Sequence, residues 1–238
     1  YAEDQFYRDT QIALAGIGSH GAFAHLYING IYWGLYNPVE RPDEHFTSEY
    51  LGGESEDWFF LNHGGATDGD AARWAYLTGT LVHRDLSVPA NYSEFQQYLD
   101  IDRFIDYLIV SWYQAITDWP QNNWYFGNRN ASSPLGSTPG QYFAWDGEWA
   151  WDTAIGYEPP YGPWVHPLFR RDADNSPFQI AAFWHALRMN NEFMTRFGDR
   201  VQRALFNGGA LTDDSARARW QALSNYIEIA ILGESARW

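Results

Sequence analysis

The sequence predicts a mixed α+β fold, in which a small antiparallel β region is followed by a mainly helical region. Two aromatic and β-branched runs flank Asn29-Gly30, a pair preferred in tight hairpin turns. Apolar residues recur at helical spacing in residues 102–116 and again through the last third of the chain. We therefore place a β-rich lobe at residues 1–92 and a helical lobe at residues 93–238, within one domain overall.

The composition limits the classes of function that the chain can have. Its 238 residues are 45% apolar, which is enough to build a large buried core. The net charge is −15 and all 15 basic residues are arginines, so we expect no nucleic-acid binding. The absence of lysine excludes a P-loop lysine, and the absence of cysteine excludes disulfides and thiolate metal sites. No apolar run is long enough to span a membrane.

The N-terminal region holds the predicted strands. The chain begins at Tyr1, which is not a natural start, and we expect the N-terminal part of a longer polypeptide to be missing. Residues 10–17 alternate loosely and predict a strand, whereas residues 21–40 predict a hairpin that turns at Asn29-Gly30. Residues 41–50 predict a short helix or a loop, and WFFL at 58–61 predicts a further strand.

Two short acidic segments offer the oxygen ligands that calcium prefers. Asp68-Gly69-Asp70 precedes a predicted helix over residues 71–83, and residues 172–175 hold two more aspartates. Neither segment has the full spacing of a calcium-binding loop, so a plain turn is the competing interpretation of each.

The strongest helical pattern lies in the middle of the chain. Ser93 and Gln96 have the spacing of a capping box, and Asp100 or Asp102 is expected to cap the helix that follows. That helix delivers the chain into Asp118. We expect its apolar face to be buried, and that face comprises Phe104, Ile105, Leu108, Ile109, Trp112 and Ile116.

Two aromatic strands are predicted after this helix, at residues 124–126 and 141–145, joined by a loop rich in Ser, Pro and Gly. In an antiparallel pair, the start of one strand lies beside the end of the other. The topology therefore brings Asp118 and Asn123, which precede the first strand, to the same end of the hairpin as Asp146 and Glu148, which follow the second.

The remainder of the chain is predicted to be a surface loop followed by helices. Residues 153–175 are rich in Pro and Gly and are typical of a loop or lid. Ser176-Pro177 has the pattern of a helix start, and that helix is expected to run to about Arg188. A second helix is expected from residue 190 or 191 to Gly208, and a third from Thr212 to Gly233.

Asp-x4-Asn with a later Asp is the arrangement that protein-kinase-type phosphotransferases use. In that chemistry one Asp orients the substrate hydroxyl, while the Asn and the second Asp hold Mg²⁺ on the nucleotide phosphates. Asp118, Asn123 and Asp146 have this order. The competing interpretations are a turn or a structural acid pair, and a glycosidase that uses Asp118 with Asp146 or Glu148 in a Trp-lined groove. The seven histidines form no HExxH motif, which argues against zinc hydrolysis.

Several blocks of the chain, in order, also resemble the CotH kinase family (spore-coat protein H). The resemblance extends from about Ala22 to the end of the chain. It is carried by HLYINGIYWGLYNPVERPDEHF, FIDYLIVSWYQAITDWPQNNWYF, FAWDGEWAWD, NEFMTRFGDRVQRALFNGGALT and ESARW.

The resemblance implies an atypical, two-lobed, kinase-like protein with an extracellular or cell-surface location. It implies that ATP with Mg²⁺ or Mn²⁺ is the cofactor and that Ser or Thr hydroxyls of a protein are the acceptor. Asp118 matches the catalytic aspartate. Asn123 and Asp146 match the metal-side residues, and Glu148 fills the next acidic position. Glu40 falls in the block that belongs to the nucleotide side.

The chain departs from the family pattern on the phosphate side. The family often has a basic residue in the region that here reads WFFLNHGG, with Asn62 and His63. With no lysine in the chain, either an arginine binds the phosphates or the phosphate-binding cation lies outside this fragment. Replacement by arginine is physically reasonable because Arg binds phosphate in a bidentate manner. A kinase-like binding module without turnover is the alternative. The candidate arginines are Arg41, Arg73, Arg170 and Arg171.

Overall fold

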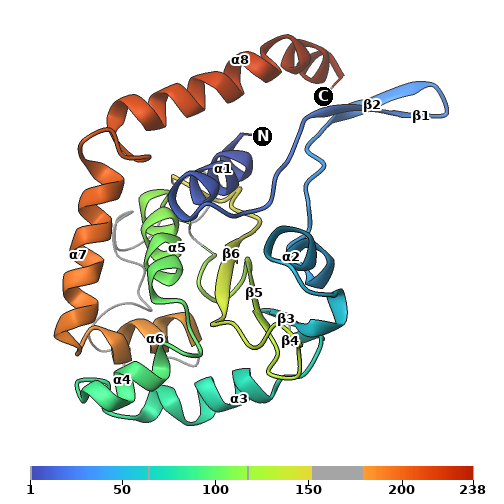
Figure 1. The fold of residues 1–238 in the computed structure, drawn as a ribbon. Coiled ribbons are helices and arrows are strands. Elements are labelled where there is room, and N and C mark those ends of the chain that lie inside the picture. The colour runs from blue at the N-terminus through green and yellow to red at the C-terminus, as the bar shows by residue number, and fades with distance from the viewer. Residues whose placement is uncertain (1, 64, 117, 152–178, 238) are drawn as a thin grey trace.

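The computed structural model describes residues 2–63, 65–116, 118–151 and 179–237 (Figure 1). Helices α1 to α8 span Glu3–Ala15, Glu44–Leu51, Ala72–Gly79, Pro89–Phe95, Ile101–Tyr113, Gln179–Leu187, Asn191–Leu205 and Asp213–Arg237. Strands β1 to β6 span Ala24–Ile28, Ile31–Tyr36, Trp58–Asn62, Gly65–Asp68, Trp124–Arg129 and Gln141–Ala144. Short 3-10 turns, η1 and η2, span Ser55–Asp57 and Leu81–His83. The predicted α+β class is confirmed.

The central sheet has the antiparallel strand order β4-β3-β5-β6. Because side chains alternate across a strand, Phe60, Tyr125 and Phe143 face α2 on one side of this sheet. Phe126 and Tyr142 face the main helical core on the other side. The predicted boundary between the lobes, at residues 92 and 93, lies within α4. Strands β3 and β4 precede this boundary and strands β5 and β6 follow it, yet all four belong to one sheet. The division into two lobes stays a prediction.

Helix α5 is the central helix of the core and packs against α1, α7 and β6. Asp100 is its N-cap, and the carboxylate accepts a hydrogen bond of 3.0 Å from Arg103 N, as predicted. The predicted apolar face is buried at Phe104, Ile105, Leu108 and Ile109 and partly buried at Trp112. Burial extends beyond that face, since Asp106, Tyr107, Val110 and Ser111 are buried as well.

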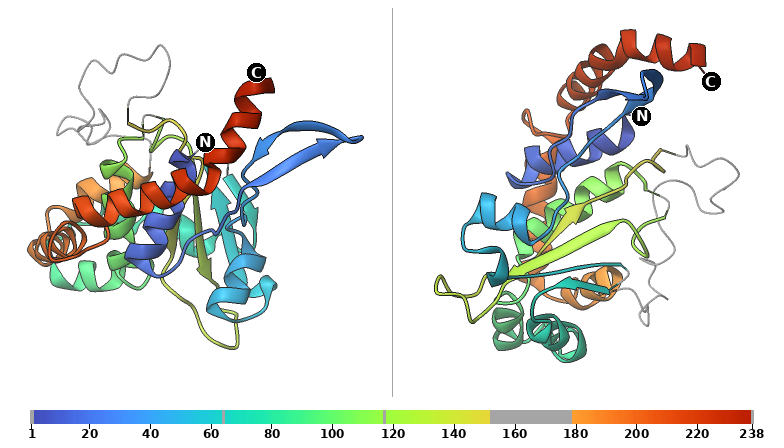
Figure 2. Two further views of the ribbon diagram at one scale, coloured as in Figure 1. Left: turned by 90° about the horizontal axis from the view of Figure 1, so that it is seen from above. Right: turned by 90° about the vertical axis from the view of Figure 1, so that its right-hand side faces the viewer.

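The β1–β2 hairpin projects from the body of the molecule (Figures 1 and 2). Its turn is formed by Asn29 and Gly30, with φ of 52° and 79°, so the predicted tight turn is confirmed. The C-terminal end of α8 packs against β2. There Glu234 accepts a hydrogen bond of 2.8 Å from Leu35 N, and the Arg237 guanidinium lies 4.8 Å from the ring centre of Trp33.

Three predicted elements were wrong in type or extent. Residues 10–15 belong to α1, which ends at Ala15, because the buried positions Phe6, Thr10 and Leu14 recur at helical spacing and begin before residue 10. Helix α4 starts at Pro89, so Ser93 lies inside it and is not a cap. Helix α8 runs past Gly233 to Arg237, where contacts with the hairpin hold its last turn.

Other predictions were confirmed or lie outside the described residues. Helices α2 and α7, with Asn190 as the cap of α7, and the strand at 58–61 are where the sequence placed them. The loop at 153–175 and the Ser176-Pro177 helix start lie outside the described residues. Among the helices that the structure describes, none is long and apolar enough to cross a membrane.

Candidate active site

Asp118 lies in a turn that is held against the core by hydrogen bonds from the buried indoles of Trp119 and Trp124. The turn follows α5 and leads into β5. Trp119 Nε1 donates to the Tyr107 hydroxyl at 2.6 Å, and Trp124 Nε1 donates to Pro120 O at 3.0 Å. Because both indoles are buried, the position of this turn is determined by core packing rather than by the turn itself.

Asn123 orients the Asp118 carboxylate, donating from Nδ2 to Asp118 Oδ2 at 2.6 Å. An ionised carboxylate only accepts hydrogen bonds, so the amide nitrogen faces it and Asn123 Oδ1 is directed elsewhere. Asp118 Oδ1 and Gln121 Oε1 are buried and have no hydrogen-bond partner among the residues that the structure describes. Buried oxygens that lack a donor are uncommon and costly, and a bound cation would satisfy them.

The loop that carries Asp146 follows β6 and is held by α1 and by the end of α5. Asp146 has a φ of 54°, in the left-handed region that Asp and Asn adopt more readily than most residues. Gly147 N donates to Asp4 Oδ1 at 2.8 Å, and Gln114 Nε2 lies 3.5 Å from Gly147 O. A Cβ on Gly147 would lie 2.5 Å from Tyr7 Cδ1, so glycine is required for this close approach.

The predicted meeting of the two acidic segments at one end of the β5–β6 hairpin is confirmed. Trp124 pairs with Ala144, which places Asn123 beside the residues that follow β6. Six non-glycine residues have positive φ within the described ranges, and Asn123 and Asp146 of the candidate site are among them. Left-handed backbone outside glycine is often found where function constrains the chain. The roles assigned to the individual residues stay predictions.

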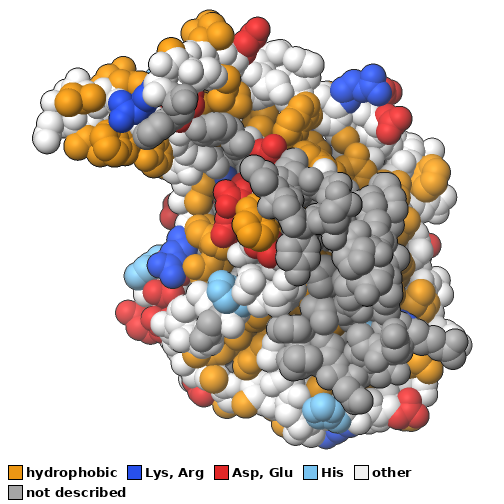
Figure 3. All heavy atoms as spheres, turned by 180° about the vertical axis from the view of Figure 1, so that it is seen from behind, with side chains coloured by type: hydrophobic (Ala, Val, Ile, Leu, Met, Phe, Trp, Pro, Cys, Tyr) orange, Lys and Arg blue, Asp and Glu red, His pale blue; other side chains and the backbone are white. Residues whose placement is uncertain are grey.

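The acids of the site repel one another. Burial, together with the charge of Asp146, raises the pKa of Asp118. Burial and the charge of Asp4 also raise the pKa of Asp146, although Arg8 acts in the opposite direction. The pKa of Glu148 is raised by burial and by the charges of the same three aspartates. Figure 3 shows a group of acidic side chains on the face of the molecule opposite to that seen in Figure 1.

His63 lies at the same end of the sheet, because it follows β3 and Asn62 pairs with Tyr125. Its imidazole is close enough to lower the pKa of both Asp118 and Asp146. The sequence pointed to this position only as a place where a basic residue is common in the family that it resembles. The structure makes His63 a cationic neighbour of the acids whenever it is protonated.

Of the predicted nucleotide-side residues, Arg41 reaches the edge of the site. Arg41 Nε donates to the Tyr125 hydroxyl at 3.1 Å, and the Tyr125 ring stacks edge-on with Trp145, the residue before Asp146, at 5.2 Å. Glu40 instead accepts hydrogen bonds from His20 N at 3.0 Å and from the Tyr50 hydroxyl at 2.8 Å. Burial raises the pKa of Glu40, but these hydrogen bonds outweigh it and the pKa is lowered overall.

Arg73, another candidate arginine, does not reach the described part of the site. Arg73 donates to Gln97 O and lies 4.3 Å from the ring centre of Tyr98. Arg73 also donates to Thr138 O, and the Thr138 hydroxyl accepts a hydrogen bond from Arg129 N. Arg129 is the last residue of β5, whereas the candidate site lies at the first, Trp124. Arg73 is therefore remote from the acids. Arg170 and Arg171 lie outside the described residues.

Three residues of the site were missed by the sequence analysis: Asp4, Arg8 and Gln114. Asp4 and Arg8 form an i,i+4 ion pair on α1, a signal that was hidden because this region was not predicted to be helical. Gln114 is fully buried, and its side-chain Nε2 donates to Glu3 O at 2.6 Å. The backbone carbonyl of Gln114 accepts a hydrogen bond from Trp151 N at 3.0 Å. A glutamine at the end of an apolar helix carries no distinguishing pattern.

The oxygen ligands present fit a divalent cation shared with a nucleotide better than a cation held by the protein alone. Among the described residues, no three His, Cys, Asp or Glu side chains converge to hold a metal ion. Mg²⁺ on a nucleotide needs only one or two protein oxygens because phosphates and water complete its coordination. Asn123 Oδ1 and Asp146 are of this kind, and the unpaired Asp118 Oδ1 lies in the same site.

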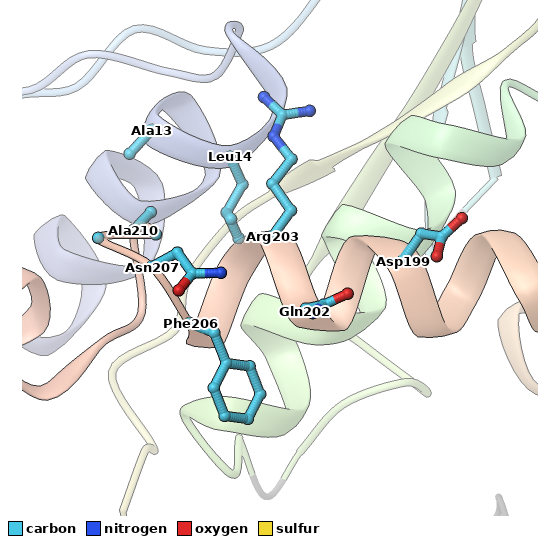
Figure 4. Close-up of a pocket in the computed structure, with 10 residues that line it drawn as sticks. Ala13, Leu14, Asp199, Gln202, Arg203, Phe206, Asn207 and Ala210 are labelled. Carbon is cyan, nitrogen blue, oxygen red and sulfur yellow. The ribbon is translucent and has the colours of Figure 1, made fainter.

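The remaining acidic segment and a surface groove lie elsewhere. Asp70 accepts a hydrogen bond of 3.0 Å from Ala72 N at the start of α3, as a plain turn residue does, and residues 172–175 lie outside the described residues. The groove, of about 610 Å³, lies between the C-terminal ends of α1 and α7 (Figure 4). The acids of the candidate site are at the opposite, N-terminal end of α1.

The model of the family described as CotH kinase protein matches residues 14–238. No curated protein matches the chain. The matched range includes the turn with Asp118 and Asn123 and the loop with Asp146 and Glu148, but it begins after Asp4 and Arg8.

Proposed function

Because the chain belongs to the CotH kinase family, we propose that it transfers the γ-phosphoryl group of ATP to a Ser or Thr hydroxyl of a protein substrate, with Mg²⁺ or Mn²⁺. The mixed α+β architecture agrees with a kinase-like fold of this family. The observation that carries the proposal is the Asp118 carboxylate. One of its oxygens is held by Asn123, and the other is buried beside further acids with no partner in the described part of the chain.

Asp118 is assigned to the substrate hydroxyl. Phosphoryl transfer needs a group that orients the attacking oxygen and accepts its proton. The Asn123 amide holds Asp118 Oδ2 at 2.6 Å and so leaves Oδ1 for the hydroxyl. The raised pKa of Asp118, which follows from its burial, makes it a better proton acceptor than an ordinary aspartate.

Asn123, Asp146 and Glu148 are assigned to the metal side. A bound divalent cation neutralises the charge that develops on the phosphate oxygens during transfer. Asn123 Oδ1 is directed away from Asp118 and remains available as a ligand. The Asp146 carboxylate accepts no hydrogen bond within the described residues, and its backbone is held through Gly147. Glu148 adds negative charge on the same side.

Arg41 is assigned to the phosphates, with His63 as a second cation. Arg41 is exposed and its guanidinium is held against Tyr125, 5.7 Å from the ring centre, at the edge of the site. An arginine in this position supplies the charge that a kinase normally takes from lysine. Glu40, next to it, belongs to the same nucleotide side. An extracellular or cell-surface location is part of the proposal and rests on the resemblance of the sequence blocks.

The test separates binding from transfer. We expect millimolar Mn²⁺ with ATP to raise the melting temperature of the chain, and Asp146→Asn to abolish this shift. Asp118→Asn should retain the shift but lose roughly 10²–10⁴-fold in phosphate incorporation into protein substrates. Glu228→Gln, which removes one exposed acid from α8, is the matched control and should change neither.

Each failure has a distinct meaning. A wild-type chain that binds Mn²⁺ and ATP but never transfers phosphate would be a kinase-like binding module. A wild-type chain with no metal-dependent nucleotide binding would refute the proposal. The competing glycosidase needs two carboxyl groups facing each other across an open groove, and the bond from Asn123 to Asp118 does not favour it.

A further inference from the structure

A buried arginine lies behind the candidate metal side. Arg8 of α1 is fully buried, a state that arginines adopt almost only when they are paired. Its guanidinium forms an ion pair with Asp4, donates to Gln5 Oε1 at 2.9 Å and donates to Asn37 Oδ1 at 2.5 Å. We call Asp4, Gln5, Arg8 and Asn37 the α1 network.

One end of the α1 network holds the acidic loop. Asp4 uses one carboxylate oxygen for Arg8 and the other for Gly147 N, at 2.8 Å. Gly147 lies between Asp146 and Glu148, in a segment without helix or strand. The bond therefore restrains the backbone of the loop while leaving the Asp146 side chain to the site. Ligand-bearing segments commonly depend on such second-layer partners for their geometry.

The other end of the network holds the base of the projecting hairpin. Asn37 follows β2, and its Nδ2 donates to Gln5 Oε1 at 3.0 Å and to Ala22 O, before β1, at 2.9 Å. A Cβ on Gly21 would lie 2.2 Å from Gln5 Oε1, so the chain entering the hairpin packs directly on the network. The same buried cation thus connects the acidic loop and the hairpin base.

We infer that Asp4 and Arg8 are positioning residues for metal binding, which hold the Asp146 loop at a set place relative to the hairpin base. The inference rests on the proposed function, because it concerns the same site. Arg8 orients the Asp4 carboxylate through their ion pair, and Asp4 fixes the Gly147 amide. Neither side chain is assigned to the substrate or to the metal.

The test measures Mn²⁺ binding directly, in the chain without substrate. Binding of Mn²⁺ with a non-hydrolysable ATP analogue is followed by the electron paramagnetic resonance of free Mn²⁺, well below the melting temperature. An asparagine at position 4 has one acceptor oxygen and cannot accept hydrogen bonds from Arg8 and from Gly147 N on separate oxygens, as Asp4 does. We therefore expect Asp4→Asn to weaken Mn²⁺ binding about 10–100-fold. Amide exchange at Gly147 should rise by a similar factor. Asn37→Ala, which cuts only the hairpin end, should leave Gly147 exchange nearly unchanged.

The matched control is Glu192→Gln, which removes the acid of another i,i+4 pair with an arginine, Arg196 on α7. It should change neither Mn²⁺ binding nor Gly147 exchange. If Asp4→Asn fails to fold, Asp4→Glu takes its place, since it retains the charge for Arg8 but displaces the carboxylate.

The outcomes separate the two proposals. If the wild-type chain and the Asp4→Asn variant bind Mn²⁺ equally well, the positioning role is refuted and the proposed function is not. This holds even if the variant melts at a lower temperature. A wild-type chain without Mn²⁺ binding refutes the proposed function, and the positioning role falls with it.

Discussion

The molecule contains two β-hairpins that are both rich in aromatic residues but differ in how far they are buried. Every residue of β5 and β6 is buried except Arg129, whereas in β1 and β2 only Gly34 and Leu35 are buried. The inner hairpin lies within a four-stranded sheet, and the outer hairpin forms a sheet of its own. An isolated two-stranded hairpin is at best marginally stable. The inner hairpin can therefore set the geometry of the acids, while the outer one depends on neighbours at its base.

The largest expected difference concerns core packing. Phe126 in β5 is 1% exposed and its ring centre lies 4.6 Å from that of Trp74, whereas Ile31 in β2 is 64% exposed. Phe126→Ala should lower the free energy of unfolding by about 3–5 kcal/mol. Ile31→Ala should change it by less than about 0.5 kcal/mol. Urea denaturation of both variants checks this, and equal effects would contradict the contrast between the hairpins.

The second prediction concerns the contact that holds the outer hairpin to α8. Glu234→Ala leaves Leu35 N–H without its acceptor, and we expect a loss of about 1–3 kcal/mol, concentrated in the hairpin. Hydrogen exchange at Leu35 should accelerate at least about tenfold. Exchange in β5 should stay unchanged. Glu228→Ala, on an exposed part of the same helix, is the control. Faster exchange in β5 would mean that the hairpins are not independent.

The third prediction concerns charge at the end of the inner hairpin. Because the pKa of Asp146 is raised in the folded protein, by burial and by Asp4, the folded state binds protons more tightly than the unfolded state. This contribution to stability is complete below the ordinary aspartate pKa and is lost as the pH rises through the raised pKa. At neutral pH the metal-free protein therefore carries unrelieved repulsion.

Asp146→Asn removes that repulsion. We expect it to raise the melting temperature of the metal-free chain by about 2–4 °C at neutral pH, corresponding to about 1 kcal/mol. The gain should shrink in acid, where the wild-type carboxyl group is protonated. Scanning calorimetry across pH measures both effects, with Glu228→Gln as the single-charge control. A variant less stable than wild type at neutral pH would show that Asp146 is stabilising in the metal-free state.

The smallest expected effect on stability is at Arg41, which lies between the two hairpins along the chain. Arg41→Gln removes a cation near the Tyr125 ring and should cost at most about 1 kcal/mol. If Arg41 binds the phosphates, the KM for ATP should nevertheless rise about tenfold with little change in kcat. Arg41→Lys should recover part of the loss. An unchanged KM would place the phosphate-binding cation elsewhere.

Local patterns were sufficient for much of the fold and for the acidic residues of the site. The Asn29-Gly30 turn, the Asp100 cap and the Asn190 cap were predicted because each depends on side chains within a few residues. The meeting of Asp118 with Asp146 followed from strand order alone. Helix α1 was missed because its apolar stripe begins before the stretch that was interpreted as a strand.

The sequence by itself determined the family, the elements that carry the acids and the side of the hairpin on which they gather. Only the tertiary structure decided what holds them there. Asp4 and Gly147 are 143 residues apart in the chain, and Leu35 and Glu234 are 199 residues apart. An aspartate four residues before an arginine resembles any solvated helical ion pair. Asp4 becomes a support for the acidic loop only because its arginine partner is buried and because a distant segment supplies the amide from which Asp4 accepts a hydrogen bond.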